Sequence, residues 1–132
     1  MKLNEENRAS IVSYRLQKAK ETLAEAKANM SLGFWRVVAN RLYYACYYAV
    51  SALLVKQGLT THTHSGTLGQ FSLHFVKSGI VSKEQSALYG KLFDIRQTGD
   101  YSDMVAIKEA DVKPFIEPAE KFVAEVEKLL NR

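Results

Sequence analysis

Residues 34–54 read FWRVVANRLYYACYYAVSALL, and this stretch decides the fold. It contains no Gly or Pro, and apolar residues recur at steps of three and four, which predicts one uninterrupted helix. The repeating set is Trp35, Val38, Leu42, Cys46, Ala49 and Leu53. Four tyrosines and Val50 fall on other sides of the same helix, so more than one face must be covered. We therefore expect the central helix of a bundle.

Helical patterns on both sides of this stretch complete the bundle. They predict helices over Glu5–Met30, Gly66–Lys77, Ser82–Arg96 and Asp111–Leu130. The first of these ends only a few residues before Phe34, so we expect it to form an antiparallel hairpin with the central helix. The sequence contains no repeats and no alternating runs of strand length. It predicts a single all-α domain over residues 1–132, an antiparallel up-and-down four-helix bundle with one additional short helix.

Capping residues set the expected ends of these helices. Asn4, Ser65 and Ser82 are predicted N-caps, because their side chains can accept from free backbone N–H groups. Gly58 and Gly79 suit helix ends, where a left-handed backbone is common. Residues 97–103, QTGDYSD, are expected to be a polar loop after the fourth helix. Pro118 removes a backbone donor, so a kink or a late start is expected in the last helix.

Composition restricts the setting of the chain. At 132 residues it can bury a core without a metal or disulfides, and its single cysteine, Cys46, cannot form an intramolecular bridge. The first residues are polar, and no apolar run reaches the roughly 20 residues that cross a bilayer. We expect a cytoplasmic protein without a membrane segment. The net charge of +4 favours anionic partners without demanding them.

Arg96, Asp100 and Tyr101 form the strongest candidate site. An Arg at the end of an inward-facing helix is followed four residues later by an Asp-Tyr pair. In a structural interpretation, Arg96 caps the helix and pairs with Asp100 while Tyr101 fastens the loop. In a functional interpretation, the two neighbours hold the guanidinium open towards solvent, where it binds an anion such as phosphate.

The loop before the third helix carries a second candidate. His62 and His64 have the spacing of two metal ligands, but no third ligand accompanies them, so we expect no metal site. His64 and Ser65 precede Gly66 at a predicted helix N-terminus, which offers donors to an anion. A simple cap is the alternative role for Ser65.

The aromatic face of the central helix is the third candidate. Asn40 and Arg41 precede Tyr43, Tyr44, Tyr47 and Tyr48, an arrangement that could stack bases and bind phosphate. For most of these rings we favour a role in the core or in a dimer interface, and we keep Asn40, Arg41 and Tyr44 as candidates. The chain has no Ser-His-Asp order, Gly-rich phosphate loop or metal-spaced Cys/His set, so ordinary hydrolase or kinase chemistry is unsupported.

Three segments in this order resemble the small stand-alone branch of the HEPN (higher eukaryotes and prokaryotes nucleotide-binding) domains. They are NRLYYACYYA at residues 40–49, THSG at 63–66 and RQTGDY at 96–101. The resemblance runs from about Glu5 to Leu130. It implies a helical bundle that is usually a homodimer and is often encoded beside a minimal nucleotidyltransferase, with which it forms a complex. Many such pairs act as toxin and antitoxin, and the HEPN member is then a metal-independent ribonuclease.

The ribonuclease members carry an Arg, four to six arbitrary residues and then a His. Here Arg96 matches the Arg, but Tyr101 stands where the shortest spacing requires His. An unperturbed Tyr has a pKa near ~10 and is a poor general base at neutral pH. The resemblance therefore implies that the anion-binding half of the motif is kept while its usual proton carrier is lost.

Our leading hypothesis is a non-catalytic, dimeric HEPN-like domain that binds nucleotide or RNA, or docks a nucleotidyltransferase, and needs no cofactor or metal. The expected binding residues are Arg96, Asp100, Tyr101, Asn40, Arg41, Tyr44, His64 and Ser65. Asp100 would orient Arg96, and Tyr101 would stack or hydrogen-bond. Two alternatives stay open: a ribonuclease toxin that uses Arg96 with Tyr101 or His64, and a helical dimerisation module that binds no ligand.

Overall fold

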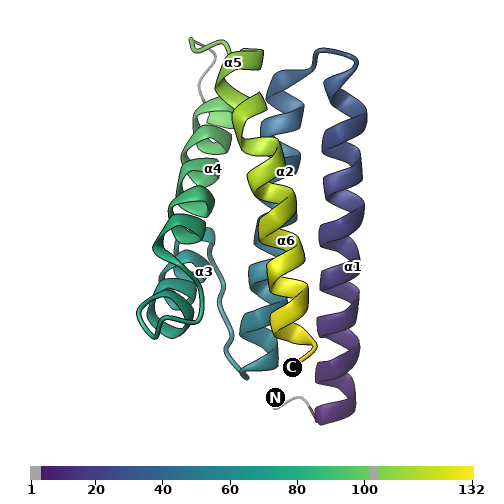
Figure 1. Ribbon diagram of the computed structural model, residues 1–132, viewed down its shortest axis with the longest axis vertical. Helices are drawn as coiled ribbons and strands as arrows, with labels where there is room; N and C mark the ends of the chain where they lie inside the picture. The colour runs from purple at the N-terminus through teal and green to yellow at the C-terminus, as the bar shows by residue number, and fades with distance from the viewer. Residues whose placement is uncertain (1–3, 102–103) are drawn as a thin grey trace.

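The protein is an antiparallel helical bundle (Figure 1). The computed structural model describes residues 4–101 and 104–132, with the side chain of Tyr101 left out. The main helices are α1 (Glu5–Met30), α2 (Trp35–Lys56), α4 (Lys83–Tyr101) and α6 (Ile116–Leu130). Short helices α3 (His64–Phe71) and α5 (Glu109–Val112) join them, with a π-helical turn η1 (Ser72–Val76) and a 3₁₀ turn η2 (Lys113–Phe115). The predicted all-α bundle is confirmed.

Helix α2 lies at the centre of the bundle, as its sequence predicts. It contacts α1 along its length and also packs against α4, α6 and α3. In Figure 1, α6 crosses in front of α2, while α1 and α4 lie on opposite sides of it. Twelve of its 22 residues are buried. Among its polar side chains, Arg36 and Lys56 near the ends are exposed, while Asn40 and Arg41 near the middle are partly buried.

The α1–α2 hairpin begins and ends where local chemistry predicts. The Asn4 side chain accepts a hydrogen bond from the Asn7 N–H at 2.7 Å, so it is the N-cap of α1. Gly58 follows α2 with φ +77°, a left-handed conformation that costs glycine little. Gly79 has the same role after η1, with φ +84°.

The third helix begins earlier than predicted. Thr63, not Ser65, is the N-cap of α3: its hydroxyl accepts from the Gly66 N–H at 2.8 Å. The prediction for Ser65 is wrong because the helix already includes His64. Ser82 does cap α4, since its hydroxyl accepts from the Gln85 N–H at 3.1 Å.

The fourth helix ends later than predicted. Residues 97–101 are helical, so the expected polar loop after Arg96 is wrong over this part. Arg36 of α2 holds the extension, because its guanidinium donates to the carbonyl of Gly99 and to that of Val105 at 3.1 Å. Arg96 and Asp100 therefore lie one turn apart on the same helix.

The last predicted helix is divided. Helix α5 and turn η2 precede α6, which begins at Ile116 and has Pro118 in its first turn. A proline is tolerated there because the N–H groups of a first turn have no intrahelical partner. The expected late start is confirmed, and Phe122, Val126 and Leu130 then face the core.

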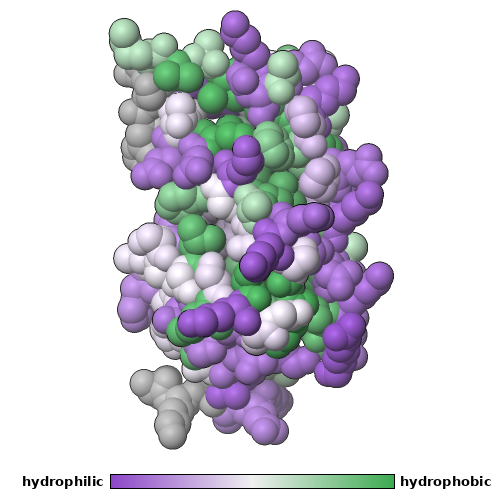
Figure 2. Space-filling model, turned by 60° about the vertical axis from the view of Figure 1, so that its left-hand side comes forward, coloured by the Kyte–Doolittle hydropathy of each residue, from purple (hydrophilic) through white to green (hydrophobic). Residues whose placement is uncertain are grey.

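Aromatic side chains form much of the core around α2. Tyr43 and Tyr89 are fully buried and stack at 5.9 Å, and Phe71 and Phe122 surround Tyr89. On the face shown in Figure 2, apolar and hydrophilic side chains alternate over short distances. Within residues 4–101 and 104–132, no helix is long and apolar enough to cross a membrane.

Candidate functional site

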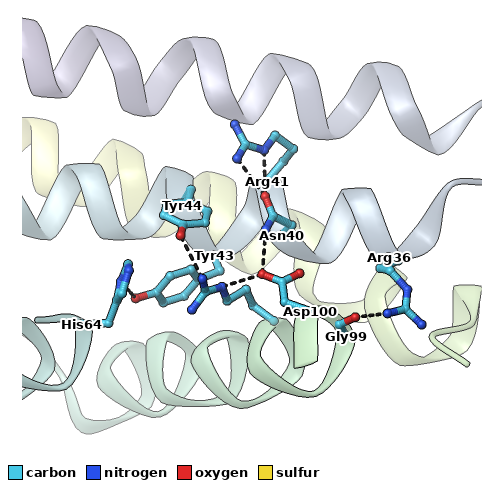
Figure 3. A network of polar contacts seen from close by, with 9 residues as sticks. Arg36, Asn40, Arg41, Tyr43, Tyr44, His64, Gly99 and Asp100 are labelled. Carbon is cyan, nitrogen blue, oxygen red and sulfur yellow. Dashed lines mark hydrogen bonds and ion pairs between the residues drawn. The ribbon is translucent and has the colours of Figure 1, made fainter. Parts of the chain in front are cut away.

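A polar network joins the middle of α2 to the end of α4 (Figure 3). Its centre is Arg96, whose Nε donates to Asp100 Oδ2 at 2.8 Å and whose second terminal nitrogen donates to the Tyr44 hydroxyl at 3.0 Å. The guanidinium also lies over the rings of Tyr43 and Tyr44, with 5.5 and 5.2 Å to their centroids. Both contacts lie within the ~6 Å over which a cation is attracted to an aromatic face.

Asn40 and Arg41 extend the network to α1. The Asn40 amide donates to Asp100 Oδ2 at 3.1 Å, and its oxygen accepts two hydrogen bonds from Arg41 at 2.7 and 3.0 Å. Arg41 pairs in turn with Glu25 of α1 at 3.2 Å, and it lies 5.3 Å from the Tyr44 centroid. Two guanidinium groups thus lie near one tyrosine ring, and each is matched by a carboxylate.

His64 joins the same aromatic group from α3. Its Nδ1 lies 2.7 Å from the Tyr43 hydroxyl, and its ring lies 4.7 Å from the Tyr47 ring and 5.7 Å from the Tyr44 ring. Tyr43 and Tyr44 each contact both His64 and Arg96, so a single tyrosine ring lies between the imidazole and the guanidinium. This histidine is predicted from the sequence as a site residue, but its contact with Tyr43 is not.

The pKa shifts at the site follow from burial and from Arg96. Burial lowers the pKa of His64 below its usual 6.5, and the nearby positive charge of Arg96 lowers it further. Burial raises the pKa of the Tyr43 hydroxyl well above its ordinary value. At neutral pH, Tyr43 thus keeps its proton and His64 favours its neutral form. With Tyr43 donating to Nδ1, the remaining ring proton of His64 is on Nε2.

The exposure of Arg96 differs from the prediction. We expected a guanidinium open to solvent, but the Arg96 side chain is only 10% exposed because α2 covers it with Tyr43 and Tyr44. Its predicted role as a helix C-cap is also wrong, because α4 continues past it to Tyr101. The predicted pairing with Asp100 is confirmed.

Most of the other predicted site residues belong to the network, but Ser65 does not. Asn40, Arg41, Tyr44, Asp100 and Arg96 meet in the network, and His64 borders it. Ser65 is exposed, and its hydroxyl lies 3.4 Å from the hydroxyl of Thr63, the N-cap. Among the described residues, Ser65 forms no hydrogen bond with the network. The side chain of Tyr101 lies outside the part that the structure describes, so its predicted contact stays a prediction.

Three residues that take part in the site were not identified from the sequence. Glu25 was missed because its pairing with Arg41 depends on how α1 and α2 are aligned along their axes, which the apolar pattern leaves open. Arg36 lies one turn before Asn40 on α2, a spacing that indicates the same face. Tyr43 was assigned to the core, where it lies, but its hydroxyl also contacts the site.

The arrangement brings together two guanidinium groups whose charges are balanced by its own carboxylates. Guanidinium groups bind phosphate through paired N–H donors, and tyrosine faces stack on bases. Asp100 and Glu25 occupy some of the donors of Arg96 and Arg41 in the free protein. Within residues 4–101 and 104–132, no three His, Cys, Asp or Glu side chains gather closely enough to hold a metal ion.

Comparison with known proteins agrees with this fold. The chain is 41% identical over 121 residues to a UPF0332 protein of Thermotoga maritima, with 92% of each chain covered. It is 29% identical to "Putative toxin MJ0605" of Methanocaldococcus jannaschii, over 98% of this chain and 95% of that one. A crystal structure of an HEPN domain protein from Thermotoga maritima matches the fold with a TM-score of 0.68 and 21% identity, over 90% of this chain and 98% of that one.

A family model settles the classification. The model of the HEPN domain matches residues 12–129, which include α2, α4, most of α1 and α6, and the whole network. The sequence resemblance rests on NRLYYACYYA, THSG and RQTGDY, and all three segments lie within this match. The chain therefore belongs to the HEPN domain family.

Proposed function

We propose that this HEPN domain binds nucleotide or RNA through the network of Arg96 and Arg41, as one member of a toxin–antitoxin-type pair. The observation that carries the proposal is the position of both guanidinium groups, 5.2 and 5.3 Å from the centroid of Tyr44. Two cations beside one aromatic ring suit a ligand that combines phosphate with a base. Two relatives from Methanocaldococcus jannaschii are named "Putative toxin MJ0142" and "Putative toxin MJ0605", and these names support the pair.

Ligand binding requires an exchange of partners at Arg96. In the free protein, Asp100 holds the guanidinium, and Asn40 bridges Asp100 to Arg41. A phosphodiester carries the same single charge as a carboxylate, but its tetrahedral oxygens can accept from both guanidinium groups at once, so it can replace Asp100 as their partner. Asp100 then orients Arg96 before binding and competes with the ligand during binding.

The competition gives a direct test. Asp100→Asn removes the competing charge but keeps an oxygen for Arg96, and we expect it to tighten binding of a fluorescein-labelled 12-nucleotide oligouridine about fivefold. This factor corresponds to ~1 kcal/mol, the upper range for a partly exposed ion pair. Arg41→Ala should weaken binding. Lys91→Ala, which removes an exposed charge on α4, is the matched control. Unchanged affinity in both site variants would contradict the proposal.

The proposed partner is a minimal nucleotidyltransferase, and the domain itself is proposed to be a cytoplasmic homodimer. Both proposals rest on the HEPN family, whose small stand-alone members are usually dimers beside such an enzyme. Sedimentation equilibrium tests the dimer. Co-expression with a short nucleotidyltransferase from the adjacent reading frame tests the partner: the two chains should elute as one complex, and separate elution would contradict the pairing.

A metal-independent ribonuclease is the second candidate, and His64 is the observation that favours it. This ring lies one tyrosine ring away from Arg96 and favours its neutral form, so it can replace the missing motif histidine. A general base needs a free lone pair, however, and Tyr43 engages Nδ1. The ribonuclease therefore requires the tautomer in which Nδ1–H donates to Tyr43 and Nε2 accepts a proton.

Growth and cleavage assays separate the two candidates. A ribonuclease should arrest growth on expression, and both Arg96→Ala and His64→Ala should relieve the arrest. The purified enzyme should cleave RNA in excess EDTA. A binding domain should leave growth and RNA intact, and its His64→Gln variant should still bind the oligouridine.

A further inference from the structure

A groove of about 450 Å³ lies between α1, α2 and the loop that follows α2, and basic and aromatic side chains form part of its lining. Helix α1 contributes a tyrosine and two cations, and α2 contributes two tyrosines and a serine. These residues are Tyr14, Arg15, Lys18, Tyr47, Tyr48 and Ser51. The volume falls within the ~300–1,000 Å³ range of ligand pockets.

A buried serine fixes the direction of one cation. Ser51 is 9% exposed and lies inside the apolar, buried segment 49–54 of α2, where a hydroxyl needs a partner. That partner is Arg15, whose guanidinium donates to the Ser51 oxygen. The bond reaches from α1 to α2, so it holds the positive charge of Arg15 in the groove.

The charge of the groove is not balanced by carboxylates. Among the described residues, neither Arg15 nor Lys18 forms an ion pair, and no Asp or Glu lines the groove. The Arg96 network differs, because each of its two cations has an acidic partner. The groove is therefore the more positive of the two sites, and a phosphate can bind there without displacing a carboxylate.

Tyrosine rings connect the groove to the network. The Tyr44 ring, which contacts both network cations, lies 5.9 Å from Tyr47 and 6.0 Å from Tyr48. Tyr47 and Tyr48 also line the groove, and both are partly exposed. Tyrosine rings on α2 thus lie between the cations of the network and the two cations that α1 brings to the groove.

We infer that this groove is a second phosphate-binding subsite, which takes the next part of a single-stranded oligonucleotide bound at the Arg96 network. The inference rests on the proposed function, and it narrows the expected ligand from nucleotide or RNA to a strand of several nucleotides. Arg15 and Lys18 bind phosphates, and the exposed tyrosine faces stack on bases. Stacking tolerates any base, so the groove adds affinity without sequence preference.

Salt-dependent binding tests the inference. Each phosphate contact with a single strand contributes about 0.7 to the slope of log affinity against log salt. Arg15→Ala/Lys18→Ala should thus reduce the slope by about 1.4 and weaken binding of the 12-nucleotide oligouridine about 25-fold at 0.1 M salt. Binding of UMP should change less than twofold. The control is Lys113→Ala/Lys121→Ala, which removes two cations that are 62% and 75% exposed.

A second variant tests the inference even if the double variant does not fold. Arg15→Ala removes the partner of Ser51, so circular dichroism must show that the double variant is folded. Lys18→Glu changes charge alone, because the Lys18 ammonium has no hydrogen bond among the described residues, and it should also weaken the oligouridine. A 12-nucleotide oligothymidine should lose affinity by the same factor, since the groove contacts phosphate and base only.

The outcomes separate this inference from the proposed function. If Asp100→Asn and Arg41→Ala change oligouridine affinity while the groove variants behave like the control, the inference fails alone. If only the groove variants weaken binding, the proposed site at Arg96 fails and the groove stands by itself. Displacement of the oligouridine by polyglutamate as readily as by unlabelled oligouridine would overturn the nucleic-acid assignment in favour of an acidic protein.

Discussion

Replacing Arg96 with Ala should lower the free energy of unfolding by about 2–4 kcal/mol. A hydrogen bond to a charged group contributes ~1.5–3 kcal/mol, and Arg96 donates to the Asp100 carboxylate and to the Tyr44 hydroxyl. Its two aromatic contacts add ~0.5–1 kcal/mol each. The Asp100 side chain is 24% exposed, so water can partly solvate its carboxylate once Arg96 is removed. The expected loss of stability is therefore smaller than the sum of these contributions.

Urea unfolding followed by circular dichroism at 222 nm measures this loss. A domain of this size loses about 4 °C in Tm per kcal/mol, so a thermal scan should show a decrease of about 8–16 °C. Asp100→Ala should cost less, and the double variant should reveal a coupling free energy of ~1–2 kcal/mol between the two residues. Lys91→Ala should change stability by less than ~0.5 kcal/mol. An Arg96→Ala variant as stable as the Lys91 control would refute the packing that we describe.

The remaining predictions concern the α3 cap, His64 and the buried thiol. Thr63→Ala should cost ~1 kcal/mol of stability in urea unfolding and Ser65→Ala almost nothing, since only Thr63 caps α3; equal losses would contradict the assignment. Folded His64 has a pKa below 6.5, so its contribution to stability is complete above pH 6.5 and declines as the pH falls towards the folded pKa. The wild type should therefore lose more stability between pH 7.5 and 5.5 than His64→Gln, and equal losses would count against the shift. Burial raises the pKa of the Cys46 thiol and leaves it 0% exposed, so it should react with a disulfide reagent only at the rate of unfolding; rapid labelling would show an accessible thiol.

The fold could be predicted largely because its signals are local. The spacing of apolar residues in 34–54 requires cover on several faces, and the structure surrounds α2 with other helices. Asn4 and Ser82 mark helix starts through bonds to residues three positions away. The end of α4 was missed because Gly99 in a polar segment resembles a loop, while the contact that holds it comes from Arg36, 63 residues away.

The sequence predicted most residues of the candidate site but not how they are arranged. The sequence indicated Asn40, Arg41, Tyr44 and Arg96, and they do meet. The burial of Arg96 could not be derived, because it depends on how α2 and α4 are aligned along their axes. The groove at Arg15 was missed for a similar reason: its bond to Ser51 joins two helices whose register the apolar pattern leaves open.

The exchange of Asp100 for a ligand phosphate at Arg96 is the central claim, and NMR of arginine side chains tests it most directly. The Arg96 Nε–H donates to Asp100, so its resonance reports which acceptor the group has. On titration with the 12-nucleotide oligouridine, we predict that this resonance moves with the same affinity that anisotropy measures, together with that of Arg41. An Arg96 resonance that stays fixed while resonances elsewhere respond would show that this guanidinium belongs to the packing of the bundle alone.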